Sequence, residues 1–255
     1  MGTNYNPKIV TNGLTTYYDP ANSKSYPGSG TTVYDLSSAN QNGTMVNGPT
    51  YSSDDAGTFV FDGVNDYVGT NTSTDSRLYS AWTVNGVYGY PTEKTIEIWV
   101  RTSETAGYLV SRPWNGGGQY NYRLHPGGAY VLVGGESTHQ ESSITFSSIS
   151  DGEWHQVVLF MDKTNFGVFI DGASTSTQKA HNFTSGSLAH GGYGNTGDSN
   201  LSTVIMSLYP YGGAWAGNTS FSITGSVAIF RQYNRVLSQD EIKQNFNATR
   251  GRFGI

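Results

Sequence analysis

Few carboxylates in this chain stand at a spacing that could serve catalysis. Glu93 and Glu97 lie four residues apart at the start of the alternating stretch 95–101, so they share a face only if both belong to the strand. Glycoside hydrolysis needs two carboxyl groups about 5–9 Å apart across the scissile bond. Glu97 is followed on its own face by Trp99 and Arg101 instead of a second carboxylate. We therefore expect a protein that is not an enzyme and has no catalytic residues, and Glu97 is the residue on which an enzyme hypothesis would depend.

A second chemical feature is the oxygen-rich turn Asp62-Gly-Val-Asn-Asp66. Calcium takes six to eight oxygen ligands from carboxylates, amides and backbone carbonyls, and Asp62, Asn65 and Asp66 offer side chains of these types. The same pattern is also ordinary turn chemistry, in which Asp and Asn side chains accept hydrogen bonds from nearby backbone amides. We favour turn chemistry over a metal site.

Aromatic residues in the irregular segments are the strongest sign of a ligand. Binding sites combine apolar and aromatic side chains with a few polar groups, and sugars stack their C–H faces on such rings. The alternative is that these rings cover the ends of the domain or pack against a neighbouring subunit, where Tyr and Trp are also enriched. Both interpretations stay open. The candidate ligand-binding residues are Trp82, Tyr88, Tyr90, Trp114, Tyr193, Tyr211 and Trp215.

Composition excludes several classes of partner and site. The formal net charge is −5, and the 14 Lys and Arg residues are scattered singly, so we expect no nucleic-acid partner. There are no cysteines, which excludes disulfides and thiol chemistry and suits synthesis in a reducing cytosol. No apolar run approaches the roughly 20 residues of a membrane span, so we expect no membrane insertion.

The same composition favours short strands joined by many turns. Only 13% of the residues are charged, 33 are Gly, and no linker divides residues 1–255, which we interpret as a single domain. The stretch 95–101 alternates apolar and polar residues, which predicts a strand with Trp99 in a structural role. Further strands are expected over 107–112, 120–124, 129–133, 154–161, 166–170, 202–209 and 226–233.

Two turns and one helix connect or follow these strands. The turn at 62–66 lies between 57–62 and 67–68, which predicts a hairpin, and Asp171-Gly172 predicts a type I′ hairpin, whose two central residues need positive φ. The stretch 237–246 predicts a short helix, because Ser-x-x-Glu makes a capping box and two apolar residues follow at i and i+4 spacing. We expect this helix to plug an edge or an end of the strand layers.

In their order along the chain, these segments resemble the laminin-G-like jelly-roll family of the concanavalin-A-like lectin and glucanase superfamily. The resemblance implies an all-β, two-sheet antiparallel jelly-roll sandwich with one short C-terminal helix. Many relatives bind calcium near such loops, which makes Asp62, Asn65 and Asp66 candidate calcium ligands. The matching segments are 13–14 with 17–19, 34–43, 61–68, 95–100, 151–155, 169–172 and 225–242.

Within that family, residues 24–30 and the terminal Arg-Phe-Gly-Ile are similar to virion structural proteins of tailed bacteriophages. This resemblance implies a non-enzymatic capsid decoration or tail-fibre protein, made in the host cytoplasm and displayed on the virion surface. Its partners would be other virion proteins or copies of itself, together with a host cell-surface glycan. One alternative is an extracellular carbohydrate-binding module, which we would expect to arise from a precursor with a leader, whereas this chain starts at Met1. A polysaccharide-cleaving enzyme of the same superfamily is the less favoured alternative.

Overall fold

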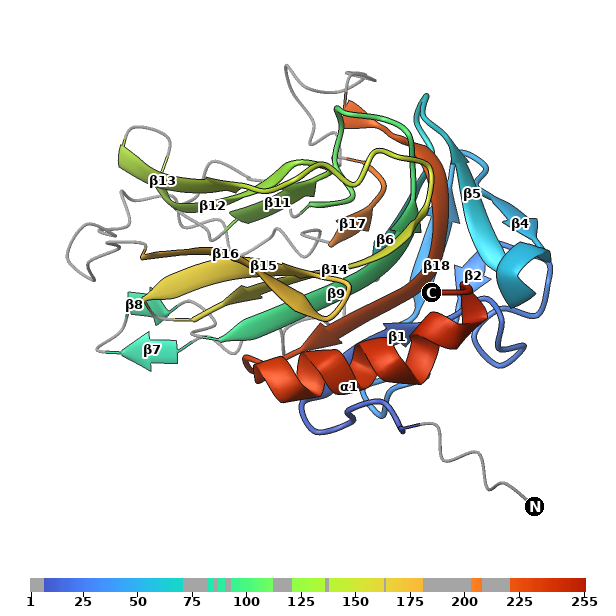
Figure 1. The fold of residues 1–255 in the computed structure, drawn as a ribbon, viewed down its shortest axis with the longest axis horizontal. Helices are drawn as coiled ribbons and strands as arrows, with labels where there is room; N and C mark the ends of the chain where they lie inside the picture. The colour runs from blue at the N-terminus through green and yellow to red at the C-terminus, as the bar shows by residue number, and fades with distance from the viewer. Residues whose placement is uncertain are drawn as a thin grey trace.

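Two antiparallel sheets packed face to face make up the fold (Figure 1). The computed structural model describes residues 7–70, 82–84, 87–89, 93–111, 121–135, 138–162, 164–180, 203–207 and 221–255. Within these ranges each of the two sheets has eight strands, and one α-helix lies outside them. This confirms the expected all-β jelly-roll sandwich with a C-terminal helix.

The first sheet contains the longest strand, β18, and both the first and the last strand of the chain that the structure describes. Its strands are β1 (Leu14–Tyr18), β4 (Thr50–Ser52), β5 (Thr58–Asp62), β9 (Lys94–Arg101), β14 (Trp154–Met161), β15 (Asn165–Ile170), β16 (Ala173–Ala180) and β18 (Thr224–Tyr233). They are ordered β16-β15-β14-β9-β18-β5-β4, and β1 also pairs with β18. The N-terminal and C-terminal segments therefore lie together in the middle of one sheet.

The second sheet contains a meander of consecutive strands. Its strands are β2 (Thr32–Val33), β3 (Gly43–Val46), β6 (Tyr67–Thr70), β10 (Val110–Ser111), β11 (Asn121–His125), β12 (Gly128–Gly135), β13 (Thr138–Thr145) and β17 (Val204–Ile205). They are ordered β13-β12-β11-β10-β17-β6-β3-β2, so β10 to β13 are successive antiparallel neighbours. The strands β10, β11 and β12 confirm the strands predicted over 107–112, 120–124 and 129–133, whereas β13 was not predicted.

The turn at 62–66 does not make the predicted hairpin. Asp62 pairs with Thr224 in the first sheet, whereas Tyr67 pairs with Val46 in the second. β5 and β6 therefore belong to different sheets, and the turn carries the chain from one layer to the other. The prediction was wrong because turn residues specify a local reversal of the chain, and not the strand with which the next segment pairs.

One face of strand β9 lies in the core between the two sheets. Ile96, Ile98 and Val100 face the second sheet and are fully buried against residues such as Tyr122 and Leu124. Burial of each such side chain stabilises the fold by about 1.5–3 kcal/mol.

The opposite face of β9 is buried as well. Trp99 lies in a separate cluster with Trp154 and Ile229, and Phe246 and Phe253 pack against it from the C-terminal segment. Trp99 and Trp154 are structural residues, as expected.

The Asp171-Gly172 turn joins β15 to β16 as predicted. The φ angles of the two residues are 52° and 73°, so both are in the left-handed region that a type I′ turn requires. A Cβ on Gly172 would lie 3.1 Å from the Cβ of Phe246, so this turn touches the C-terminal helix closely.

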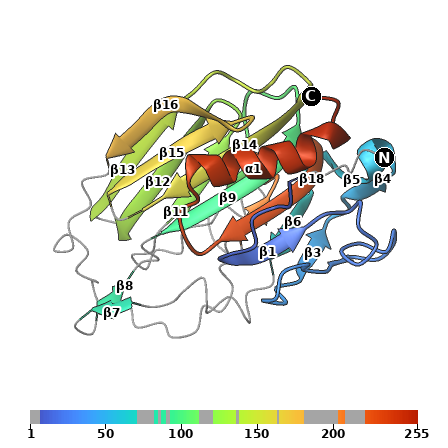
Figure 2. The same ribbon diagram turned by 60° about the horizontal axis from the view of Figure 1, so that its bottom comes forward.

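Helix α1 (Gln239–Thr249) lies across the outer face of the first sheet (Figure 2). This corrects the expectation that it plugs an edge or an end. Ile242 is fully buried against β14 and β15 residues, and Phe246 stacks on Trp99 with the rings 5.7 Å apart and nearly parallel. The helix settles on this face because its apolar stripe covers the side of β9 that the core leaves open.

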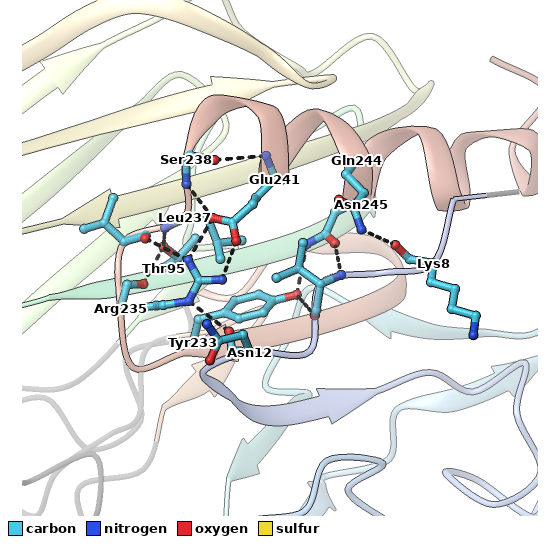
Figure 3. A network of polar contacts seen from close by, with 12 residues as sticks. Lys8, Asn12, Thr95, Tyr233, Arg235, Leu237, Ser238, Glu241, Gln244 and Asn245 are labelled. Atoms are coloured by element: carbon cyan, nitrogen blue, oxygen red, sulfur yellow. Dashed lines mark hydrogen bonds and ion pairs between the residues drawn. The ribbon is translucent and has the colours of Figure 1, made fainter.

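The start of the helix has the predicted capping box (Figure 3). Ser238 Oγ accepts from the amide of Glu241, and Glu241 Oε2 accepts from the amide of Ser238. Arg235 holds the same carboxylate through two nitrogen–oxygen contacts of 2.6 and 2.8 Å.

Two short 3₁₀ helices are described besides α1, namely η1 (Asp54–Ala56) and η4 (Arg250–Arg252). Among the residues with a described structure, no helix has the length and apolar character to span a membrane.

Candidate functional site

The carboxylate that an enzyme hypothesis would need is sealed inside the protein. Glu97 has no exposed surface, and it lies under helix α1 on the outer face of the first sheet. Glu97 Oε1 accepts from Arg231 at 2.7 Å and from Gln156 at 2.9 Å, while Oε2 accepts from Asn245 at 2.8 Å. Glu93 is exposed at the strand start. Glu97 therefore holds the fold together and cannot meet a polysaccharide.

The carboxylates of the 62–66 turn are bonded mainly within the turn. Asp62 Oδ1 accepts from the amide of Val64 at 2.7 Å, and Asp66 Oδ2 accepts from the amide of Asp62 at 3.2 Å. The backbone oxygen of Asn65 accepts from Asn47 at 2.9 Å. In the described ranges, no cluster of three or more His, Asp or Glu side chains is arranged to hold a metal ion.

One atom of this turn remains unsatisfied. Asp66 is 4% exposed, and no donor from the described part of the chain reaches its Oδ1. Burial raises the pKa of the Asp66 carboxyl above its usual value, and Asp62 adds to the effect, although the Asp62 amide opposes it. Either a proton or a cation would satisfy this oxygen. The turn therefore offers one suitable oxygen to a calcium ion, but it fits the remaining ligands of a six- to eight-oxygen calcium shell poorly.

The predicted aromatic ligand residues fall largely beyond the described ranges. Tyr90, Trp114, Tyr193, Tyr211 and Trp215 lie outside the described residues. The other two belong to a two-stranded ribbon of β7 (Trp82–Val84) and β8 (Val87–Gly89). The sequence had suggested an irregular segment there, and the structure corrects this to a short pair of strands.

The structure brings together a different set of aromatic residues, on the outer face of the second sheet. Tyr122 and Leu124 of β11 point into the core, so Arg123 and His125 point outward by strand alternation. Tyr130 pairs with Arg123 across the β11–β12 ladder and lies on the same face. All three outward side chains are half-buried.

Two further rings extend this group along the sheet. The Arg123 guanidinium lies over the Tyr108 ring, 5.6 Å from its centre, and Tyr108 stacks on Phe221 at 5.3 Å. On the other side, the His125 ring is 5.2 Å from Tyr130. We call these five residues, Tyr108, Arg123, His125, Tyr130 and Phe221, the aromatic strip.

The strip combines apolar rings with one fixed cation. Arg123 Nε is buried, and no acceptor in the described part of the chain reaches it. Burial lowers the pKa of His125 below its usual value, so its ring is neutral at pH 7. Rings that stack and a guanidinium that donates are the groups that recognise a sugar face and its hydroxyls.

Sequence reasoning missed the strip although part of its signal was visible. Arg123 and Tyr130 alternate with apolar residues in two segments that the sequence identifies as neighbouring strands. Tyr108 and Phe221 are separated by more than a hundred residues, and only the folded chain places them against Arg123.

Solved structures with a similar fold include a domain of an arabinanase and binding domains of toxins. Domain 4 of AbnA, a GH43 extracellular arabinanase from Geobacillus stearothermophilus, in complex with arabinotriose, has a TM-score of 0.61 and 15% identity; the match covers 92% of this chain and 99% of that one. The binding domain of Paraclostridial Mosquitocidal Protein 1 has a TM-score of 0.60 and 16% identity, over 92% of this chain and 52% of that one.

A structure of botulinum neurotoxin type C matches with a TM-score of 0.59 and 15% identity, over 93% of this chain and 51% of that one. Cell entry of that toxin is dependent upon interaction with two ganglioside molecules. This chain thus spans about half the length of the toxin structures that it matches. At these identities the likeness establishes the fold.

Comparison with curated proteins gives no significant match. A family model does match, from residue 62 to residue 243, which is most of the chain. The match runs from the 62–66 turn into helix α1 and so includes the central strands of both sheets, the aromatic strip and the buried Glu97. The chain belongs to the concanavalin A-like lectin/glucanases superfamily.

Proposed function

We propose that this protein is a non-catalytic glycan-binding domain that recognises sugars through the aromatic strip. The observation that carries the proposal is the arrangement of Arg123 between the Tyr108 and Tyr130 rings on one outer sheet face. The burial of Glu97 supports a binding role over hydrolysis. Neighbours of the same fold also support it, namely a toxin binding domain and an arabinanase domain in complex with arabinotriose.

We further propose that the domain works on a virion surface, as a capsid decoration or fibre component made in the host cytoplasm. Its partners would then be other virion proteins or copies of itself. The support is the resemblance of residues 24–30 and 252–255 to phage virion proteins. Residues 27–30 are exposed in a loop, where they could contact a neighbouring subunit.

An extracellular carbohydrate-binding module is the second candidate. It is favoured by the AbnA domain, because the match covers nearly all of that domain and it was solved with arabinotriose. The two candidates share the same sugar-binding site and differ in what the domain is attached to.

The sugar-binding proposal is tested on a glycan array with Arg123→Ala, Tyr130→Ala and Thr44→Ala variants. Thr44 is an exposed residue on β3 of the same sheet and serves as the matched control. We expect saturable binding by the wild type and the Thr44 variant, and a loss of about tenfold or more in the two strip variants. Binding that survives both strip substitutions would overturn the assignment of the site.

Calcium is tested in the same experiment by adding calcium or EDTA. We propose that any ion would be held by Asp62, Asn65 and Asp66, with Asp66 Oδ1 as its buried ligand. If calcium takes part in binding, EDTA and an Asp66→Asn variant should weaken binding alike. If sugar binding is the same with calcium and with EDTA, calcium takes no part in it, and Asp66 acts only in the structure of the turn.

The virion proposal is tested by quantitative mass spectrometry of purified particles. We expect the protein at a fixed copy number relative to the major capsid protein. Its absence from particles, together with sugar binding that depends on the strip, would favour the extracellular module.

A further inference from the structure

A second candidate site, a groove, lies on the opposite side of the molecule, between helix α1 and the β15–β16 turn. The groove has a volume of about 600 Å³, and all of its lining residues belong to the described chain. It is on the outer face of the first sheet, whereas the aromatic strip is on the outer face of the second. The residues that matter for its chemistry are Asp171, Ser174, Lys243, Phe246, Asn247 and Arg250.

The walls of this groove are fixed by packing and hydrogen bonds. The Gly172 amide donates to Gln156 at 3.1 Å, and a side chain on Gly172 would collide with Phe246. Phe246 is in turn held by its stack on the fully buried Trp99. A ligand would therefore meet a preformed surface and would lose little affinity to ordering the protein.

The groove carries two cations that form an ion pair with no carboxylate in the described part of the chain. The helix places Lys243 and Arg250 seven residues apart, about two turns, and both line the groove and are exposed. None of the ion pairs among the described residues includes either side chain. The Arg250 guanidinium lies over the Phe246 ring, 5.7 Å from its centre, which orients it on the groove floor. This positive site stands out in a chain of net charge −5.

The one carboxylate in the lining is already occupied by the protein. Asp171 Oδ1 accepts from the amide of Gln156 at 2.9 Å, and its Oδ2 lies 2.8 Å from His155 Nδ1. Its hydrogen-bonding capacity is therefore directed to β14, and Lys243 and Arg250 dominate the charge that a ligand meets.

We propose that this groove binds a carboxylate-bearing saccharide, such as one containing hexuronate residues. Arg250 can receive a carboxylate through two parallel N–H groups, and Lys243 adds a second charge-assisted contact. Asn247 and Ser174 supply the amide and hydroxyl groups that pair with sugar hydroxyls. The inference is independent of the aromatic strip, because it rests on a different sheet face and a different ligand chemistry.

The test is isothermal titration with trigalacturonate and with its neutral methyl ester. The variants are Lys243→Ala/Arg250→Ala, Arg123→Ala in the strip, and Lys24→Ala, which removes an exposed cation elsewhere. We expect the wild type and Lys24→Ala to bind trigalacturonate alike, and the groove variant to bind at least about tenfold more weakly. Arg123→Ala distinguishes the two sites, because it should keep the salt-sensitive binding that depends on Lys243 and Arg250. The ester should bind weakly to every variant, and salt should weaken binding of the acid.

Three results would overturn the proposal. One is the absence of saturable binding of trigalacturonate to the wild type. Another is unchanged binding in the groove variant, with equal urea midpoints showing that all variants are folded. A third is loss of binding in Arg123→Ala alone, which would place the acidic sugar in the strip, support the proposed function and reject the groove.

Discussion

Glu97 and Arg231 lie directly opposite each other on the central strands β9 and β18, and both side chains are 0% exposed. Arg231 Nη1 is 2.7 Å from Glu97 Oε1, and the guanidinium also lies over the Tyr17 ring at 4.8 Å. Asn245 of helix α1 donates to Glu97 Oε2 and accepts from the amide of Val10. One buried ion pair thus ties the N-terminal segment, the first sheet and the C-terminal helix together.

We expect Glu97→Gln to destabilise the protein by about 3–5 kcal/mol, because it leaves the buried Arg231 charge without its anion. The measurement is urea unfolding followed by Trp fluorescence. Glu104→Gln is the control, since Glu104 is exposed, and it should change the free energy of unfolding by less than about 0.5 kcal/mol. Equal midpoints for Glu97→Gln and the wild type would show that this pair contributes nothing to stability.

The helix cap should give the protein an acid-sensitive component of stability. The hydrogen bonds from Arg235 lower the pKa of Glu241 to about 2, against a reference value of 4.5. A lowered folded-state pKa means that the contribution is complete above pH 4.5 and is lost as pH falls towards 2. Glu241→Gln should therefore cost about 1–2 kcal/mol at pH 7 and progressively less below pH 4.5.

This acid dependence is measured by urea unfolding of the wild type and Glu241→Gln at several values of pH. Ser238→Ala is the companion variant, because it removes the other half of the capping box while leaving the Arg235–Glu241 pair. Its cost should stay nearly constant with pH. A Glu241→Gln cost that does not change between pH 7 and pH 3 would contradict the assignment.

The sequence predicts the strands better than the way in which they assemble. Alternation in 95–101 and the positive-φ pair Asp171-Gly172 are local properties, and the structure has both. The prediction of a hairpin at 62–66 was wrong, because the same turn residues also occur where the chain passes from one sheet to the other. The position of helix α1 could not be derived either, since it depends on Glu97 being buried, and a charged residue in an alternating strand is ordinarily expected to face solvent.

The aromatic strip shows the same limit for the candidate site. Arg123 and Tyr130 are placed on one face by alternation and by neighbouring strands, which the sequence does indicate. Tyr108 and Phe221 join them only through tertiary structure. Sequence reasoning looked for rings in loops, whereas three residues of the strip, Arg123, His125 and Tyr130, belong to regular strands of a sheet.

His155 should make stability depend on pH in the opposite direction to Glu241. The hydrogen bond to Asp171 raises the pKa of His155, and Asp151 adds to this, while burial opposes it. A raised folded-state pKa means that the contribution is complete below the reference value of 6.5 and is lost as pH rises through the folded value.

The experiment compares urea unfolding of the wild type and His155→Gln between pH 5 and pH 9. We expect the stability advantage of the wild type to be largest at pH 5 and to shrink above pH 6.5. Asp171→Asn is the matched variant, and it should reduce the pH dependence while leaving the imidazole in place. A constant difference across the range would mean that His155 keeps one charge state throughout.

The C-terminal tetrapeptide is a structural clamp, and its removal should loosen both buried tryptophans. Phe253 lies 4.4 Å from the Trp99 ring and 4.8 Å from the Trp154 ring. Arg252 pairs with Asp19 at 2.8 Å and also donates to backbone oxygens near η1. Phe253→Ala should therefore cost about 2–4 kcal/mol, because it leaves a cavity beside two indole rings.

The accompanying spectroscopic change is a shift of Trp emission to longer wavelength, since water would reach Trp99 and Trp154. Ile255→Ala is the control, because Ile255 is 45% exposed at the chain end and should leave both stability and emission unchanged. If Phe253→Ala behaved like that control, the terminal residues would be free of the first sheet.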